Sequence, residues 1–142
     1  MAQDDLLLEI IAPEGQVFSD SVSSVSVPSF QGQITILPHH VPLFTKLAEG
    51  EVEIRDGAKT QTIVISGGFL EVKKNEVHLL CDYAIRAESI EIAKSLERKR
   101  GAEEKLKQKL SNKDFTIADK DLKLSILELK IADKVKHRRA NN

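Results

Sequence analysis

The feature that most constrains this chain is a change of sequence pattern near Arg86. Before it, short apolar runs alternate with Pro, Gly, Asp and Asn. From Glu88 onward there is no proline, and Gly101 is the only glycine. Frequent turn residues predict short strands, whereas a long stretch without them predicts helices. We therefore expect two modules, residues 1–87 and residues 88–142.

The N-terminal module has the pattern of an antiparallel β-sandwich. Residues 51–55 alternate strictly between polar and apolar side chains, and Asp56-Gly57 after them is a strong hairpin signal. Gly67-Gly68 is expected to interrupt the next strand, as a bend in the chain rather than a phosphate cradle. Many short strands at close spacing are typical of a sandwich or barrel. The remaining expected strands cover residues 6–11, 17–18, 22–27, 34–37, 60–65, 69–72 and 77–81.

The C-terminal module is predicted to be a two-helix antiparallel hairpin with a turn at residues 111–114. Ser89 is the expected N-cap of the first helix. Asp114 is the expected cap of the second, which should run to about Lys136. Residues 122–126 alternate as a strand would, but the phase breaks after them and helix formers surround them, so helix is favoured.

Apolar periodicity assigns faces to both helices. In the first helix one face is expected to carry Ile92, Leu96, Leu106 and Leu110. The second helix has two apolar faces, of which one can pack on the first helix and the other needs the sandwich or a partner. These two faces are Leu122, Ile126 and Leu129, and Leu124, Leu127, Ile131 and Val135.

Charge is divided unevenly along the chain. Residues 1–93 hold 14 acidic and 6 basic side chains, whereas residues 94–142 hold 8 acidic and 15 basic ones. The basic half suits nucleic acid, anionic lipid or an acidic protein surface. The last cations of the chain have two interpretations. They either lie at a solvated helix end, where positive charge suits the negative end of the helix dipole, or form a binding surface. They are Lys134, Lys136, His137, Arg138 and Arg139.

Motifs of catalysis are missing from the sequence. It has no Walker-type phosphate loop, GxGxxG, GxSxG or HExxH. His39 and His40 are adjacent and lack the spacing that aims two histidines at one metal. Cys81 lies in an apolar run and is expected to be a core thiol. We therefore expect a non-enzymatic interaction protein with neither a metal nor a cofactor.

Two further classes are disfavoured by composition. Aromatic residues make up 4% of the chain and Trp is absent, which argues against a protein that stacks bases. No stretch approaches the roughly 20 apolar residues of a membrane span. The acidic N-terminus resembles neither a signal peptide nor a transit peptide, so use on the cytoplasmic side is expected.

Two sequence stretches resemble signatures of the epsilon subunits of bacterial-type (F-type) ATP synthases. Residues 32–43, GQITILPHHVPL, with Leu47 and GEV at 50–52, resemble the family pattern G-x-x-G-I-x-P-x-H-x-P-L…L…G-x-V. Residues 66–72, SGGFLEV, with NEV at 75–77, match its second signature. Departures are Thr35, where the family usually has glycine, and His39, where a small residue is common. AIR at 84–86 and KRGAEE at 99–104 are similar to the family's helical part.

The resemblance implies a rotor subunit that couples ion flow to ATP synthesis. The sandwich would bind the gamma subunit and the c-subunit ring. The hairpin would fold down or extend along gamma, restraining ATP hydrolysis by meeting acidic loops of beta in the alpha-beta hexamer. It would lie on the cytoplasmic face of a bacterial plasma membrane, peripherally, reaching the membrane only through the synthase. The implied ring and gamma contacts are Gln31, Gly32, Gln33, His40, Val41 and Pro42, and the inhibitory basic face is Lys105, Lys107, Lys109, Lys123 and Lys130.

Some members of this family bind ATP on the hairpin through an I/L-D-x-x-R-A motif. The matching residues carry Glu for Asp, Lys for Arg and Ser for Ala, and Lys lacks the bidentate fork of Arg. ATP is therefore expected to be at most a weak regulatory ligand. Two other hypotheses stay open, an ATP sensor and an adaptor for nucleic acid or anionic membranes through the basic tail. The candidate nucleotide residues are Ile90, Glu91, Lys94, Ser95 and Lys130.

Overall fold

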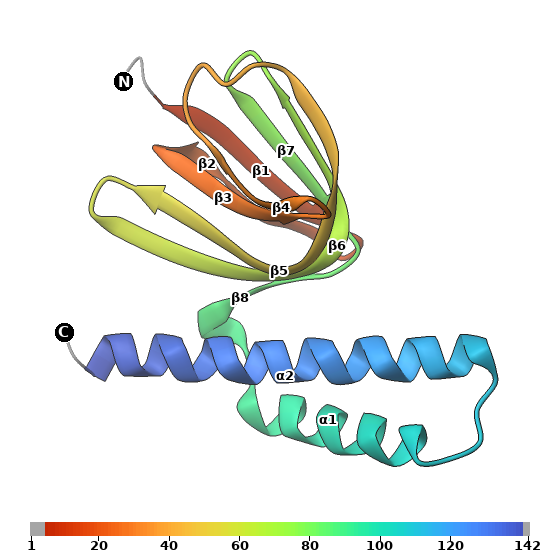
Figure 1. Cartoon of the computed structure of the whole chain (residues 1–142). Helices are drawn as coiled ribbons and strands as arrows, with labels where there is room; N and C mark the ends of the chain where they lie inside the picture. The colour runs from red at the N-terminus through yellow and green to blue at the C-terminus, as the bar shows by residue number, and fades with distance from the viewer. Residues whose placement is uncertain (1–4, 141–142) are drawn as a thin grey trace. The chain divides into compact units, whose positions relative to one another are not determined.

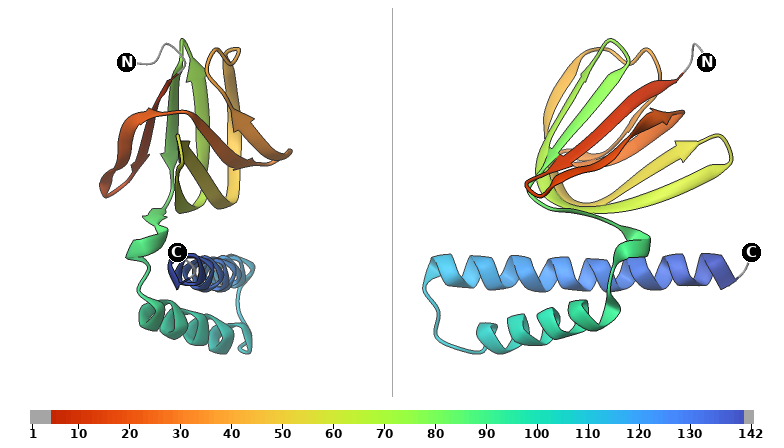
Figure 2. Two further views of the ribbon diagram at one scale, coloured as in Figure 1. Left: turned by 90° about the vertical axis from the view of Figure 1, so that its left-hand side faces the viewer. Right: turned by 180° about the vertical axis from the view of Figure 1, so that it is seen from behind.

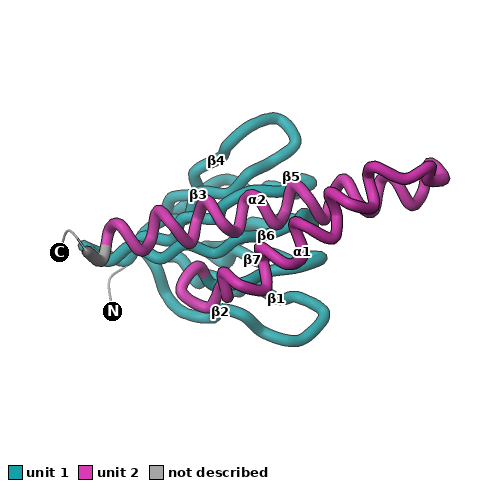
Figure 3. Tube along the Cα trace, turned by 90° about the horizontal axis from the view of Figure 1, so that it is seen from below, with its two compact units in different colours: residues 1–86 teal, residues 87–142 magenta. Residues whose placement is uncertain are grey.

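A computed structural model describes residues 5–140, and the chain divides into two compact units, residues 1–86 and 87–142 (Figure 3). The first unit contains only strands and the second only helices (Figure 1). The strands are β1 (Leu6–Ala12), β2 (Gly15–Val22), β3 (Ser24–Ser29), β4 (Gly32–Ile36), β5 (Leu43–Asp56), β6 (Lys59–Lys73), β7 (Glu76–Cys81) and β8 (Ala84–Arg86). The helices are the short 3-10 helix η1 (Ala87–Ser89), α1 (Ile92–Leu106) and α2 (Asn112–Ala140).

The first unit is the expected β-sandwich, formed by one sheet that folds over on itself. The strand order is β2-β1-β7-β6-β5-β3-β4, and β8 pairs with β6 beside this path. All neighbours are antiparallel except β1 and β7, which run parallel. Figure 2 shows β5 and β6 curving so that each takes part in both layers. The two long strands therefore join the halves of the sandwich.

The bend in β6 requires glycine. Gly67 and Gly68 have φ angles of 121° and 133°, a region that residues with a side chain rarely adopt. A Cβ at Gly68 would overlap the carbonyl oxygen of Leu80 and lie 2.8 Å from the Cα of Cys81. The expected bend at this pair is confirmed, but the expected break in the strand is wrong, because β6 stays paired on both sides of it. The two glycines bend the strand without ending it.

Alternating side chains fill the space between the layers. In β1, Leu6, Leu8 and Ile10 are fully buried, and the residues between them point outward. Burying a large aliphatic side chain stabilises a fold by about 1.5–3 kcal/mol. The remaining core residues, contributed by the other strands, are Phe18, Val22, Val25, Val27, Ile36, Leu47, Val52, Ile54, Ile63, Ile65, Leu70, Val72, Val77, Leu79 and Cys81.

The second unit is the expected helical hairpin, with different caps. Ser89 lies in η1, and Glu91 precedes α1 without a side-chain cap. Ser111 caps α2, since its Oγ accepts the N–H of Asp114 at 3.2 Å. Asp114 was the expected cap and instead supplies negative charge to the first turn. Helix α2 continues to Ala140, and the strand alternative for its middle is excluded.

The expected apolar faces are only partly buried. In α1, Ile92 and Leu96 are 43% and 48% exposed, while Ser95 and Ala102 are buried. The predicted apolar face of α1 is therefore largely open at these two positions. In α2 the first predicted face is largely open, with Ile126 46% exposed and its other two residues half-buried. The second face is better covered, and the buried residues of α2 are Ala118, Leu124, Ser125, Glu128, Ile131 and Ala132.

Candidate functional site

The turn between β3 and β4 presents three of the predicted contact residues. Ser29 is buried, and its Oγ donates to the carbonyl oxygen of Gly32 at 2.5 Å and accepts the N–H of Gln31 at 3.2 Å. The turn is fixed to β5, because Phe30 N–H donates to the carbonyl oxygen of Lys46 at 3.2 Å. Gln31, Gly32 and Gln33 are consequently held in a defined turn and exposed to solvent.

The loop between β4 and β5 presents the other three. His40 N–H donates to the carbonyl oxygen of Leu37 at 3.2 Å, and His39 between them has a φ angle of 67°. Pro38 followed by a positive φ is typical of a type II turn. His40 Nδ1 lies 2.7 Å from the carbonyl oxygen of Val41. His40 is half-buried, whereas Val41 and the following Pro42 are exposed.

A hydrogen bond connects this loop to a second turn. His39 N–H donates to Oδ1 of Asn75 at 2.5 Å, and Asn75 lies in the turn between β6 and β7. Lys74 and Asn75 both have positive φ angles, of 51° and 62°. The loop and this turn thus lie side by side at the upper end of the sandwich in Figure 1. We call residues 31–33 and 37–42 the end loops.

An exposed aromatic surface, which sequence reasoning missed, covers the outside of one layer. Phe44 of β5 stacks on Phe69 of β6 with ring centroids 5.7 Å apart, and their exposed fractions are 67% and 46%. Leu80 of β7 is paired with Phe69 and is 56% exposed. Lys46 is paired with Phe69 on the other side, and its Nζ lies 4.5 Å from the ring centroid of Phe30. We call these five residues the aromatic face.

An acidic row borders the aromatic face. Glu9 of β1 and Glu71 of β6 are paired with His78 of β7 from its two sides. His78 Nδ1 lies 3.5 Å from Oε1 of Glu9, and its Nε2 lies 3.6 Å from Oε2 of Glu76. An apolar centre with charged margins is a common composition for a protein-binding surface.

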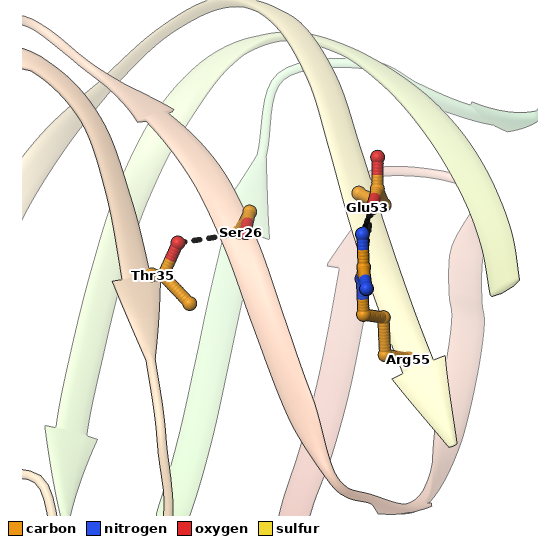
Figure 4. A network of polar contacts seen from close by, with 4 residues as sticks. All are labelled: Ser26, Thr35, Glu53 and Arg55. Carbon is orange, nitrogen blue, oxygen red and sulfur yellow. Dashed lines mark hydrogen bonds and ion pairs between the residues drawn. The ribbon is translucent and has the colours of Figure 1, made fainter. Parts of the chain in front are cut away.

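The outside of the other layer is polar. Ser26 of β3 and Thr35 of β4 share a hydrogen bond of 2.9 Å between their hydroxyl groups. On β5, Arg55 Nη2 lies 2.9 Å from Oε1 of Glu53 (Figure 4). These side chains satisfy one another along the strands. The two outer faces of the sandwich therefore differ, and the aromatic face is the one suited to an extensive apolar contact.

The candidate nucleotide residues are placed poorly for binding phosphate. Lys94 Nζ lies 3.2 Å from Oε2 of Glu91, so its ammonium group already contacts a carboxylate. Ser95 is 2% exposed, which withdraws its hydroxyl from a ligand in solution. Ile90 is half-buried, and Lys130 is exposed on α2. The structure thus joins Lys94 to Glu91 and buries Ser95.

The lysines of the predicted basic face are all exposed. Lys123 Nζ lies 2.9 Å from Oδ2 of Asp119 one turn earlier on α2. Lys105 lines a cavity at the turn of the hairpin together with Asp114 and Asp121. Of the terminal cations, Lys134, Lys136 and Arg138 are exposed, and the side chain of Arg139 lies outside the described residues. The other exposed lysines of this face are Lys107, Lys109 and Lys130.

A partly buried ion pair in the hairpin was also missed, in which the Arg98 side chain is 32% exposed. Glu128 of α2 is 1% exposed and pairs with the guanidinium of Arg98 of α1. Charged side chains are rarely buried unless they are paired in this way. The sequence signal is weak, because Glu128 stands among Leu and Lys residues that look like any amphipathic helix.

Chemically reactive groups are sparse in the described part of the chain. Burial, reinforced by the neighbouring charge of Asp82, raises the pKa of the Cys81 thiol to about 12. A thiol in that state is a poor nucleophile at neutral pH. Residues 5–140 contain no cluster of three or more His, Cys, Asp or Glu side chains arranged to hold a metal ion. Neither helix among them is long and apolar enough to span a bilayer.

Comparison with known proteins gives concordant matches. Residues 5–87 match the family model described as ATP synthase, Delta/Epsilon chain, beta-sandwich domain. An ATP synthase epsilon chain of Dehalococcoides mccartyi is 39% identical over 130 residues, covering 91% of this chain and 93% of that protein. An ATP synthase epsilon chain of Pelotomaculum thermopropionicum is 42% identical over 102 residues, covering 72% and 76%.

Two solved structures share the fold at low sequence identity. A chain of the Euglena gracilis mitochondrial ATP synthase superposes with a TM-score of 0.73 at 23% identity, covering 91% of this chain and 81% of that one. A chain of the Tetrahymena thermophila mitochondrial ATP synthase central stalk and c-ring gives 0.64 at 12% identity, covering 89% and 96%. These likenesses extend the agreement from the sandwich to most of the chain.

Proposed function

The chain belongs to the epsilon chains of ATP synthase, and we propose that it is a non-catalytic rotor subunit of that complex. In this role the sandwich attaches the chain to the rotor and the hairpin restrains ATP hydrolysis. The observation that carries the proposal is the aromatic face, an apolar surface on a sandwich whose other outer face is polar.

We assign the aromatic face to the gamma subunit. Phe44, Phe69 and Leu80 are held on adjacent strands, so the surface is preformed and loses little conformational entropy on binding. The acidic row of Glu9, Glu71 and Glu76 beside it favours a partner with basic side chains at the matching margin. Exposed aromatic residues at the centre of such a surface commonly contribute most of the binding energy.

The end loops are assigned to the c-subunit ring. Gln31, Gln33 and His40 offer polar side chains, and Val41 and Pro42 offer apolar surface, on backbone that hydrogen bonds hold in place. Loops held by a rigid scaffold are frequent sites of contact. Through them the chain would lie peripherally at the cytoplasmic face of the membrane, held there by the complex.

The hairpin is assigned to the control of hydrolysis. Its lysines are exposed and spread over both helices, which suits the acidic loops of beta in the alpha-beta hexamer. We propose no catalytic activity and ATP affinity no tighter than about millimolar, equivalent to roughly 4 kcal/mol. The Lys94–Glu91 contact and the burial of Ser95 support weak nucleotide binding.

Truncation after Ala87 tests this division of labour. The shortened chain keeps every strand and should still bind gamma and support coupled synthesis, while losing restraint of hydrolysis by the reconstituted catalytic head. Neutralising five lysines together, Lys105, Lys107, Lys109, Lys123 and Lys130, should weaken restraint more than any single change, since one surface pair contributes less than about 1 kcal/mol. A truncated chain that restrains hydrolysis as well as the full one contradicts the assignment.

A further inference from the structure

The seam between α1 and α2 is built from small side chains. The buried residues of α1, Ser95 and Ala102, are seven positions apart, and Ala118, Ser125 and Ala132 repeat at the same spacing in α2. Seven residues make two helical turns, so each set forms one stripe. The two helices pack on each other as an antiparallel hairpin, so these stripes of small side chains belong to the helices that form the seam.

Charges of opposite sign lie along the same stripes. Arg98, between the two small residues of α1, pairs with the buried carboxylate of Glu128 on α2. Nearer the turn, Lys105 of α1 lines one cavity with Asp114 and Asp121 of α2. Thus α1 contributes positive side chains to the seam and α2 contributes negative ones.

Several large apolar side chains of the hairpin lie largely outside this seam, although Leu124 and Ile131 of α2 are buried. Ile92 and Leu96 of α1 and Ile117 and Ile126 of α2 are each 43–55% exposed. Small side chains bury little apolar area, which limits the hydrophobic contribution. A buried ion pair commonly gives no net stability over an apolar pair of similar size, but it specifies one arrangement. The Arg98–Glu128 pair therefore contributes more to the register of the helices than to their stability.

We propose that the Arg98–Glu128 pair is an electrostatic latch that closes the hairpin in one register and allows it to open. When the helices separate, the buried carboxylate of Glu128 regains water and the partly exposed Arg98 becomes fully hydrated, which lowers the cost of opening compared with a seam of leucines. In any other register Glu128 would be buried without its guanidinium partner. The latch itself does not depend on the proposed function. Its consequence does rest on the proposed function: while the seam is closed, the hairpin cannot restrain ATP hydrolysis.

Distance measurements between spin labels on the full-length chain test the latch directly. Labels at Arg100→Cys of α1 and Lys120→Cys of α2 sit on exposed positions, one on each helix, and buried Cys81 stays unlabelled. Glu128→Gln keeps the shape and removes the charge, and should raise the separated fraction at least about threefold. The double exchange Arg98→Glu with Glu128→Arg should restore closure, and high salt should act like Glu128→Gln.

Two further variants keep the test decisive. The matched control exchanges the exposed pair Glu91 and Lys94, and should leave the distances unchanged. Replacing the latch with Arg98→Met and Glu128→Leu should lower the separated fraction, and this variant decides the matter if Glu128→Gln loses helicity by circular dichroism. The latch is refuted if the label distances are unchanged in the Glu128→Gln chain. It is also refuted if the double exchange fails to restore the closed distances although the protein remains helical.

A second arm separates the latch from the proposed function. Hydrolysis by the reconstituted catalytic head is measured with the wild-type chain and the Arg98→Met, Glu128→Leu chain. The closed variant should restrain hydrolysis less, because its helices separate less often. If the distances respond as expected and restraint does not, the latch stands and the assignment of restraint to the opened hairpin fails.

Discussion

Removing the exposed phenylalanines of the aromatic face should weaken gamma binding and leave the chain folded. Phe44 and Phe69 are 67% and 46% exposed. A phenylalanine has roughly 200 Å² of surface, so about 130 and 90 Å² remain for a partner to bury. At about 25 cal/mol per Å² these areas give about 3 and 2 kcal/mol, which are upper bounds for each residue.

Each single change, Phe44→Ala or Phe69→Ala, should raise the Kd for gamma by about 30-fold, the equivalent of about 2 kcal/mol. The double variant should lose less than the sum, because the two rings stack on each other. Stability of the free chain should fall by only about 1 kcal/mol, mainly through the lost ring contact. Calorimetric titration with purified gamma measures the first quantity and urea unfolding the second.

Phe115→Ala is the matched control, since Phe115 lies on α2 and is 52% exposed. It should leave the Kd for gamma within about twofold, because surface area alone does not produce affinity. A change below about threefold for both Phe44→Ala and Phe69→Ala, or an equal effect of Phe115→Ala, refutes the assignment of this face.

Three other predictions follow from single positions. Gln33→Trp and His40→Glu should loosen coupling of proton pumping to hydrolysis without lowering the melting temperature, and unchanged coupling in both counts against the ring assignment. Gly68→Ala should destabilise the chain by at least about 2 kcal/mol through backbone strain. Gly101 has open space around it, so Gly101→Ala should stabilise the chain by about 0.5–1 kcal/mol. Equal urea midpoints for the two variants would contradict this prediction. The pKa of Cys81 is raised from 9.0 to about 12 in the folded chain, so the unfolded chain loses this proton first as the pH rises. The free energy of unfolding should therefore fall from pH 9 toward pH 12. The same fall in a Cys81→Ala chain would contradict this prediction.

The sequence predicted the fold class well because turns and periodicity are local properties. Asp56-Gly57 marks the β5–β6 hairpin, and the lack of turn residues after Glu88 marks the helices. The full lengths of β5 and β6 were not predictable in the same way. Whether Gly67-Gly68 ends a strand or bends it depends on the backbone of β7, which approaches from a distant part of the sequence.

The candidate site was predictable where spacing carries the information and not where burial decides. The end loops follow from Pro38, His40 and Pro42, whose order fits the signature of the family. The aromatic face could not be predicted in this way. In Phe69-Leu70 and in Leu79-Leu80 both neighbours are apolar, so the sequence does not show which of the two is exposed. Alternation shows that one residue of each pair points outward, but only the assembled sheet shows that Phe69 and Leu80 adjoin.

The hairpin departs from prediction for a reason that bears on its function. Pattern arguments place apolar residues against the neighbouring helix, and on that assumption Ile92 and Leu96 should have been buried. Instead α1 buries Ser95 and Ala102 and pairs Arg98 with Glu128, while Ile92 and Leu96 remain about half exposed. A helix pair selected only for stability would exchange these roles. A pair that must also separate benefits from the arrangement found here, because opening exposes small and charged groups to water, while the apolar groups that a new partner would bury are accessible from the start.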